Sequence, residues 1–312
     1  MRKLIQNIVA GSRLTLPITI VYAVCIWLSC GLITQNLWLQ FGCFAVTSYL
    51  MMVLNNQNAL IRIFSRLVSC AFLVLSCAAC FLMPSTREGI MQMFLVGAYL
   101  LLFQGYQRRD AAGIIYYSFL MFGFASLVCP HILYFIPLLW LLMATNLLAI
   151  SWRTWTASLL GLLTPYWFIL AWVLYQQDFS LITSHFSPLF DFQFPIRYEK
   201  LGINVLLTWG LLAICAVTGI VHLIRKNGYD SIRIRLLYGI FIWMDLFAFA
   251  LMFFQPQHYN MLLRVIIINT SPLIAHFLAL TSTKITNVAF YVLTGLILII
   301  TAFNVWSILF PF

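Results

Sequence analysis

The sequence predicts an all-α fold, a polytopic bundle of about 11 transmembrane helices, with 10 and 12 spans as the alternatives. Of its 312 residues, 63% are hydrophobic and 8% are charged, whereas a soluble domain averages about 25% charged residues. A water-soluble fold of this length has too little interior to hide so much apolar surface. The composition therefore excludes a soluble enzyme, a disordered protein and a secreted disulfide scaffold, and it fits a protein that lies in a lipid bilayer.

The predicted spans are apolar segments between charged residues, prolines and breaks rich in Asn and Gln. A spanning helix needs roughly 20 apolar residues. The second segment is short, and the fifth and sixth are separated only by Cys129-Pro130-His131. In order, the segments cover about 14–34, 37–54, 63–82, 90–107, 112–130, 131–150, 155–175, 203–224, 236–254, 259–280 and 286–309.

The basic residues alternate between the two ends of these segments. With a cytoplasmic N-terminus, 13 of the 17 Lys and Arg residues fall in cytoplasmic segments and 4 on the other side. Because cytoplasmic loops carry an excess of Lys and Arg, this pattern predicts an odd number of spans, with the N-terminus inside and the C-terminus outside. The net charge of +10 has the same origin. Clustered basic patches are absent, so no nucleic-acid partner is expected.

The pattern indicates one integral-membrane domain over residues 1–312, with no soluble domain between spans. The apolar run from Leu14 is long enough to span and lacks a small-x-small cleavage site, so an uncleaved first helix is expected. One substantial loop, 176–202, is predicted to lie on the outer, periplasmic side. Its alternating aromatic and polar residues are typical of a re-entrant or interface-lying segment.

The cysteines give no indication of a redox or metal site. All eight lie inside apolar runs, where cysteine behaves as a small hydrophobic residue. Cys77 and Cys80 form a CxxC motif, but no histidine or second CxxC accompanies it, which favours packing over metal binding. Phosphate-binding Gly-rich loops, HExxH and GxSxG are absent. No metal and no cofactor is expected.

Asp245 is the clearest candidate for a functional residue within the membrane, because a charge at the bilayer centre costs about 2.5–3.5 kcal/mol on the insertion scale. Arg264 lies in the next segment, and the short PQHY connection makes the two helices antiparallel neighbours. Two interpretations stay open. One is a substrate-anion or proton-linked site, and the other is a buried Asp245–Arg264 pair that fixes the hairpin.

His258 and Tyr259 stand at the outer mouth of the same hairpin, near Arg264. Such a cluster suits a phosphate or diphosphate head group, since Arg presents a planar fork of donors. The alternative is an ordinary interfacial belt, where these residue types are common. Further along, Asn269 and His276 share another face of that helix, and each is expected to hydrogen-bond to a neighbouring helix.

The outer loop holds the candidates for a catalytic base. Asp178, Asp191 and Glu199 are carboxylates that can take a proton from an acceptor hydroxyl, and His185 is a further base or substrate-binding candidate. Acids in loops are more often simply solvated, and their spacing selects none of them.

Three stretches resemble an uncharacterised family of polytopic inner-membrane proteins of Bacteroidota: LNNQNALIR, GFASLVCPHILYFIPLLW and SWRTWTASLLGLLTPYWF. The likeness spans roughly residues 50–175 and brings no known activity. More distantly, the layout is similar to multi-spanning polyprenyl-phosphate-sugar glycosyltransferases and glycan polymerases, which work at the periplasmic face. Those enzymes typically carry an acid in the first outer loop, where this chain has Thr34-Gln35-Asn36. The resemblance implies a bacterial inner (cytoplasmic) membrane protein of the cell envelope.

Three functions compete at this point. The first is an envelope-glycan enzyme that transfers a sugar from a polyprenyl-phosphate carrier, with Asp191 or Glu199 as base and Arg264 as phosphate anchor. The second is a transporter or a flippase for a lipid-linked substrate, with Asp245 and Arg264 at membrane depth. The third is a non-catalytic scaffold subunit of an envelope complex. The expected partners are membrane lipids, a polyprenyl-phosphate-linked substrate and envelope-complex proteins.

Overall fold

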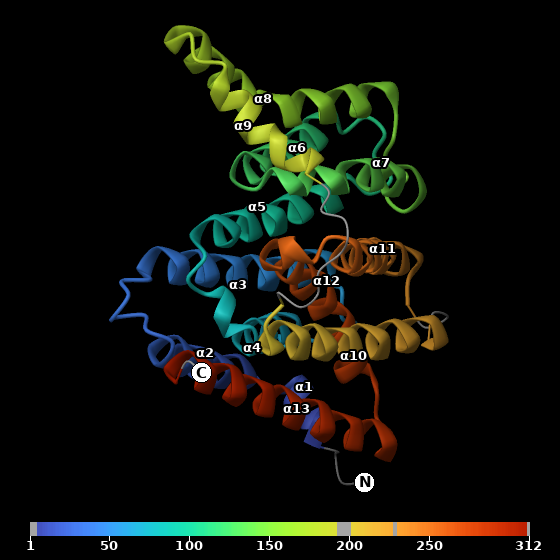
Figure 1. Ribbon diagram of the computed structural model, residues 1–312. Helices are drawn as coiled ribbons and strands as arrows, with labels where there is room; N and C mark the ends of the chain where they lie inside the picture. The colour runs from blue at the N-terminus through green and yellow to red at the C-terminus, as the bar shows by residue number, and fades with distance from the viewer. Residues whose placement is uncertain (1–4, 192–200, 227–229, 311–312) are drawn as a thin grey trace. The chain divides into compact units, whose positions relative to one another are not determined.

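A computed structural model describes residues 5–191, 201–226 and 230–310 (Figure 1). Within these ranges every regular element is a helix, as the sequence predicts, and each of the predicted apolar segments contains one. The α-helices are α1 (Ile5–Gly11), α2 (Thr15–Ser29), α3 (Trp38–Asn58), α4 (Leu67–Ala78), α5 (Thr86–Leu102), α6 (Ala112–Val128), α7 (Ile136–Thr145), α8 (Trp152–Gln176), α9 (Ser180–Phe186), α10 (Ile203–Lys226), α11 (Ile232–Phe254), α12 (Tyr259–Leu280) and α13 (Lys284–Leu309). Short 3-10 helices are η1 (Cys80–Leu82), η2 (Phe103–Gly105), η3 (Pro130–Phe135), η4 (Ser187–Phe190) and η7 (Pro256–His258).

Seven of the described helices are long and apolar enough to cross a membrane: α3, α5 with η2, α8, α10, α11, α12 with η7, and α13. Helices α1 and α2 pass the same test together but meet at a 90° bend, and α4, α6 and the joined η3–α7 are shorter apolar helices. The chain is thus a multi-pass membrane protein. The count of 11 spans and the orientation of the termini stay predictions.

The chain divides into two compact units. Unit 1 comprises residues 1–86 and 198–312, and unit 2 comprises residues 87–197. The sequence pattern predicts a single membrane domain and does not mark these boundaries, because apolar helices continue through both units.

Helix α12 is the core of unit 1. It packs against α4, α10 and α11, and every residue from Met261 to Phe277 is buried. Gly219 of α10 makes the close approach of α10 to α12 feasible, since a Cβ there would lie 2.7 Å from the backbone carbonyl carbon of Leu273. Small residues of this kind allow helix backbones to approach closely within membranes.

Unit 2 is organised around the pair α6 and α8. A Cβ on Gly161 of α8 would overlap the carbonyl oxygen of Tyr116, and one on Gly123 of α6 would lie 2.9 Å from the carbonyl oxygen of Leu162. Across the same interface, the hydroxyl of Tyr166 donates to Oγ of Ser126 at 2.8 Å. The two glycines therefore set the distance between these helices.

The starts of two long helices follow from their capping residues. Ser151 caps α8 and Thr283 caps α13, in each case with a reciprocal hydrogen bond to a threonine three residues further on. Such capping boxes satisfy the orphan N–H groups of the first helical turn. They explain why both helices begin at the edge of the apolar segments predicted from the sequence.

Candidate functional site

Two acidic side chains are buried among the residues that the structure describes, and both interact with α12. Asp245 accepts a hydrogen bond from Thr270, and Asp230 contacts His276. The other described acids are partly or fully exposed: Glu88, Asp110, Asp178 and Asp191. Ionisable groups within spanning segments are rare and mark substrate or proton pathways. The candidate site is therefore the set of polar groups along α12.

Asp230 joins three separate stretches of unit 1. It lies just before α11, with Oδ1 3.0 Å from Nε of Arg62, which precedes α4, and Oδ2 3.1 Å from Nε2 of His276 on α12. The side chains of Asp230 and His276 are 2% and 1% exposed, whereas that of Arg62 is 41% exposed. We call Arg62, Asp230 and His276 the Asp230 cluster. It has a buried interior and one edge that reaches the surface.

Aromatic rings enclose His276 on its other sides. The ring of Tyr238 on α11 lies 4.8 Å from that of His276, and the ring of His222 on α10 lies 5.4 Å away, measured between centroids. The hydroxyl of Tyr238 donates to the carbonyl oxygen of Leu60 at 3.4 Å. The packing fixes the imidazole between α10 and α11.

The Asp230 cluster has the chemical parts needed to bind and release a proton. Histidine is the side chain that ordinarily titrates closest to neutral pH, and a carboxylate that contacts its ring shares the proton with it. Within the described residues, Nδ1 of His276 has no hydrogen-bond partner. The exposed side chain of Arg62 connects the buried Asp230–His276 pair with the surface of unit 1.

Asp245 forms the second polar group along α12. Its carboxyl accepts from the hydroxyl of Thr270, with Oγ1 3.1 Å from Oδ2 and 3.3 Å from Oδ1, and the side chain is fully buried. Thr270 lies six residues before His276, which corresponds to about 9 Å along the helix axis. The two buried acids thus contact α12 at different depths.

Arg264 forms the third polar group and does not pair with Asp245. Its Nη2 donates to the carbonyl oxygen of Leu82 at 2.5 Å and to Oγ of Ser85 at 3.0 Å, so it connects α12 to the end of η1 and to the residues after it. Of the two interpretations left open by the sequence, the Asp245–Arg264 pair is not formed, because Thr270, which faces Asp245, and Arg264 are six residues apart and point in directions roughly 120° apart around the helix.

His258 and Tyr259 lie where the sequence predicts, at the turn between α11 and α12. Both are half-buried, and Nε2 of His258 lies 3.3 Å from Nε2 of Gln257. Of the two residues expected to bond to other helices, Asn269 donates to the carbonyl oxygen of Val265 in its own helix at 2.9 Å, whereas His276 contacts Asp230.

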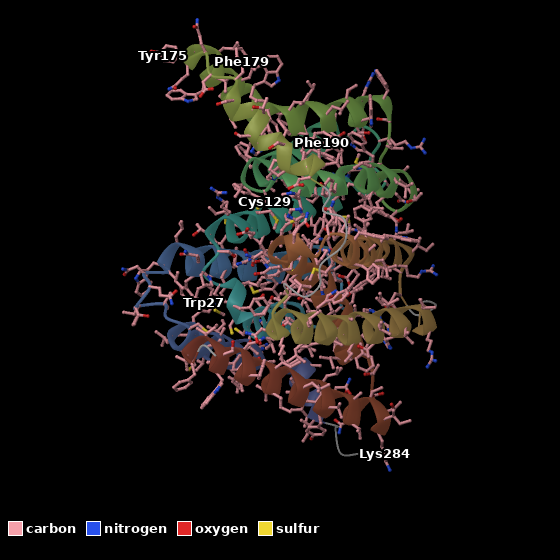
Figure 2. The ribbon with its side chains drawn as sticks, viewed as in Figure 1. Trp27, Cys129, Tyr175, Phe179, Phe190 and Lys284 are labelled. Atoms are coloured by element: carbon pink, nitrogen blue, oxygen red, sulfur yellow. The ribbon has the colours of Figure 1, made fainter. Side chains whose placement is uncertain are left out.

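The catalytic candidates of the outer loop are in unit 2, apart from Glu199, which lies outside the described residues. Asp178 and Asp191 are exposed, and hydrogen bonds from Ser180 hold the pKa of Asp178 below its ordinary value. His185 packs against Phe186 with ring centroids 5.0 Å apart, and burial lowers the pKa of His185. Part of the predicted loop is helical, in α9 and η4, and Figure 2 shows Phe179 and Phe190 on this segment, with Tyr175 near the end of α8.

The sequence gives little indication of the Asp230 cluster. Arg62 and Asp230 fall between the predicted apolar segments, and they lie far apart in the chain. The one available indication is that Asp230 is an acid in a connection otherwise rich in Arg and Lys. Residues of two connections meet the last turns of α12 here, because α3, α11 and α12 all have an end at this level of unit 1.

No family model, no curated protein and no solved structure matches the chain. In the described part of the sequence, no group of three or more His, Cys, Asp or Glu side chains is arranged to hold a metal ion. The eight cysteines are free thiols, and seven of them are buried. Inference about function therefore rests on the polar groups along α12.

Proposed function

We propose that this protein is a transporter that moves its substrate across the membrane in step with protonation of buried groups on and around α12. The observation that carries the proposal is that the two buried acids in the described residues, Asp230 and Asp245, both interact with this one buried helix. Burial of an acidic side chain among apolar helices costs free energy, which favours a role in the activity over a role in packing.

The two acids suit different tasks in a transport cycle. Asp245 lies near the middle of α11, at membrane depth, with a hydroxyl as its hydrogen-bond partner. It is proposed as the group that binds the coupling proton. The Asp230 cluster holds three chain segments together at one end of unit 1, and a change in its protonation alters those ties. The Asp230 cluster is proposed to hold that end of unit 1 closed, and its three residues separate when the site opens.

The proposed topology has eleven spans in the bacterial inner membrane, with the N-terminus in the cytoplasm and the C-terminus outside. Hydrogen bonds between distant segments support it. Gln6 bonds to Thr281, and Arg233 to Asn58, which joins segments that this topology puts at the cytoplasmic face. Asn204 bonds to Ser307, which joins segments that it puts at the outer face. The resemblance to inner-membrane proteins of Bacteroidota agrees with this location.

The proposal is tested with purified protein in liposomes that contain a pH-sensitive dye. Sugars, amino acids, organic anions and nucleosides are added one class at a time, with protein-free liposomes as the control. A proton-linked transporter moves protons into or out of the vesicles when, and only when, its substrate class is present. If no class changes the internal pH relative to the protein-free vesicles, proton-linked transport of these solutes is excluded.

Sugar transfer from a polyprenyl-phosphate carrier is the second candidate. The exposed acids Asp178 and Asp191, beside the aromatic residues of α9 and η4, are the observation that favours it. Mass spectrometry of lipid-linked glycans in cells with and without the gene separates the alternatives. A precursor that accumulates on the periplasmic face supports a transferase or polymerase, and one on the cytoplasmic face supports a flippase. Unchanged glycans contradict both and leave another solute or a scaffold role.

A further inference from the structure

A pocket of about 270 Å³ lies between α2, α3 and α4 of unit 1. Its lining is almost wholly apolar and includes Leu16 and Ala23 of α2, Phe41 and Phe44 of α3, and Leu73 of α4. An enclosed apolar cavity of about 150 Å³ already binds a benzene-sized molecule, so this pocket has room for a longer hydrocarbon segment. Because apolar membrane helices surround it, a lipid chain is the hydrocarbon within reach.

One end of the pocket carries an unused hydrogen-bonding group. Ser69 lines the pocket in the first turn of α4, and its side chain is 1% exposed. Its Oγ has no hydrogen-bond partner among the described residues, whereas the hydroxyl of Ser48, also in the lining, donates to the carbonyl oxygen of Phe44. A buried hydroxyl without a partner costs free energy, so a ligand atom that accepts from Ser69 is favoured.

Two arginines stand at the same end. Helices α2 and α4 run parallel there, with Oγ1 of Thr19 3.4 Å from Sγ of Cys70. Arg13 lies just before α2 and is exposed, and Arg66 directly precedes α4 and is half-buried. Arg13 is six residues before Thr19 and Arg66 is four residues before Cys70, so both precede the Thr19–Cys70 contact toward this end. Neither forms an ion pair with another described residue.

We propose that this pocket binds an anionic glycerophospholipid, with one acyl chain between α2, α3 and α4 and the phosphate against Arg13 and Arg66. The hydroxyl of Ser69 donates to the ester carbonyl of that chain. Each part of the lipid meets matching chemistry: the chain meets apolar side chains, the ester meets a free donor and the phosphate meets guanidinium groups. This site lies apart from the polar groups of α12 and does not depend on the transport proposal.

The test uses full-length protein that has been stripped of lipid in detergent. Phosphatidylglycerol, or phosphatidylcholine with the same acyl chains, is added, and bound lipid is measured by native mass spectrometry. We expect the wild type to bind phosphatidylglycerol about tenfold more tightly than phosphatidylcholine, because the choline cation of phosphatidylcholine cancels the negative charge that attracts the two arginines. Arg13→Gln together with Arg66→Gln is expected to remove that preference. Equal binding of the two lipids by the wild type would overturn the assignment of the arginines.

The pocket itself is tested by filling it. Ala45 lines the pocket at an exposed position, so Ala45→Trp fills the pocket without disturbing the core. Both lipids should bind to this variant about tenfold more weakly than to the wild type. The matched control is Val46→Trp, because Val46 is 46% exposed and is not part of the lining. If Ala45→Trp binds lipid as the wild type does, the pocket is not the site. If Ala45→Trp does not elute as a single species, lipid binding by Ser69→Ala is measured instead. Reduced lipid binding by Ser69→Ala supports the site, and unchanged binding overturns it.

Discussion

At the residue scale, Asp230→Asn is expected to destabilise the protein by about 1–3 kcal/mol, because buried His276 loses a charged partner. Arg62→Gln should cost less, since the side chain of Arg62 is 41% exposed and an exposed ion pair contributes little. The thermal unfolding midpoint in detergent measures both effects. Asp110→Asn, at an exposed position, serves as the control. Equal midpoints for Asp230→Asn and the control would show that the cluster does not hold unit 1 together.

Asp230 and Asp245 differ in how far the sequence predicts them. The sequence predicts Asp245 as a candidate because it is the one acid within its apolar segment, and the structure buries it fully. Its partner could not be predicted, since a helix places side chains by angle as well as by depth, and Thr270 faces Asp245 where Arg264 does not. The Asp230 cluster could not be predicted either, because only the folded chain brings Arg62, Asp230 and His276 together.

At the scale of elements, the predicted segments and the observed helices agree well. Apolar length locates the helices, and Ser151 and Thr283 set two of their starts. Three segments differ from the prediction. The first ends at Ser29 and not near residue 34. The third begins at Leu67 and not near residue 63, and it is divided into α4 and η1. The sixth is divided into η3 and α7, because Pro130 and Pro137 lie in the first turns of these two elements.

Helix α10 offers an internal comparison of two glycines. Gly219→Ala is expected to destabilise the protein by about 1–3 kcal/mol, because the new Cβ meets the backbone of Leu273 and pushes α10 away from α12. Gly210→Ala, on the same helix with nothing within 4 Å of a Cβ, should be neutral or gain up to about 1 kcal/mol from helix propensity. Unfolding midpoints in detergent compare the two. A result in which both variants behave alike would contradict the close packing of α10 on α12.

At the scale of the whole molecule, the alternation of basic residues and the long-range hydrogen bonds lead to the same topology. Reporter fusions after Arg109 and after the last residue test it. We expect green fluorescent protein to fluoresce after Arg109 and alkaline phosphatase to be active at the C-terminus, as eleven spans require. A cytoplasmic C-terminus would indicate 10 or 12 spans and would require a different assignment of the shorter helices α4, α6 and η3–α7.

In the proposed transport cycle, a buried carboxyl beside α12 binds the proton that is coupled to transport. The most direct test compares Asp245→Asn and Thr270→Val with the exposed control Asp110→Asn in the dye-loaded liposomes, with the substrate class that the wild type moves. We predict that Asp245→Asn abolishes substrate-driven proton movement, that Thr270→Val reduces it by removing the hydroxyl donor, and that Asp110→Asn leaves it unchanged. Full proton movement in Asp245→Asn would contradict the claim.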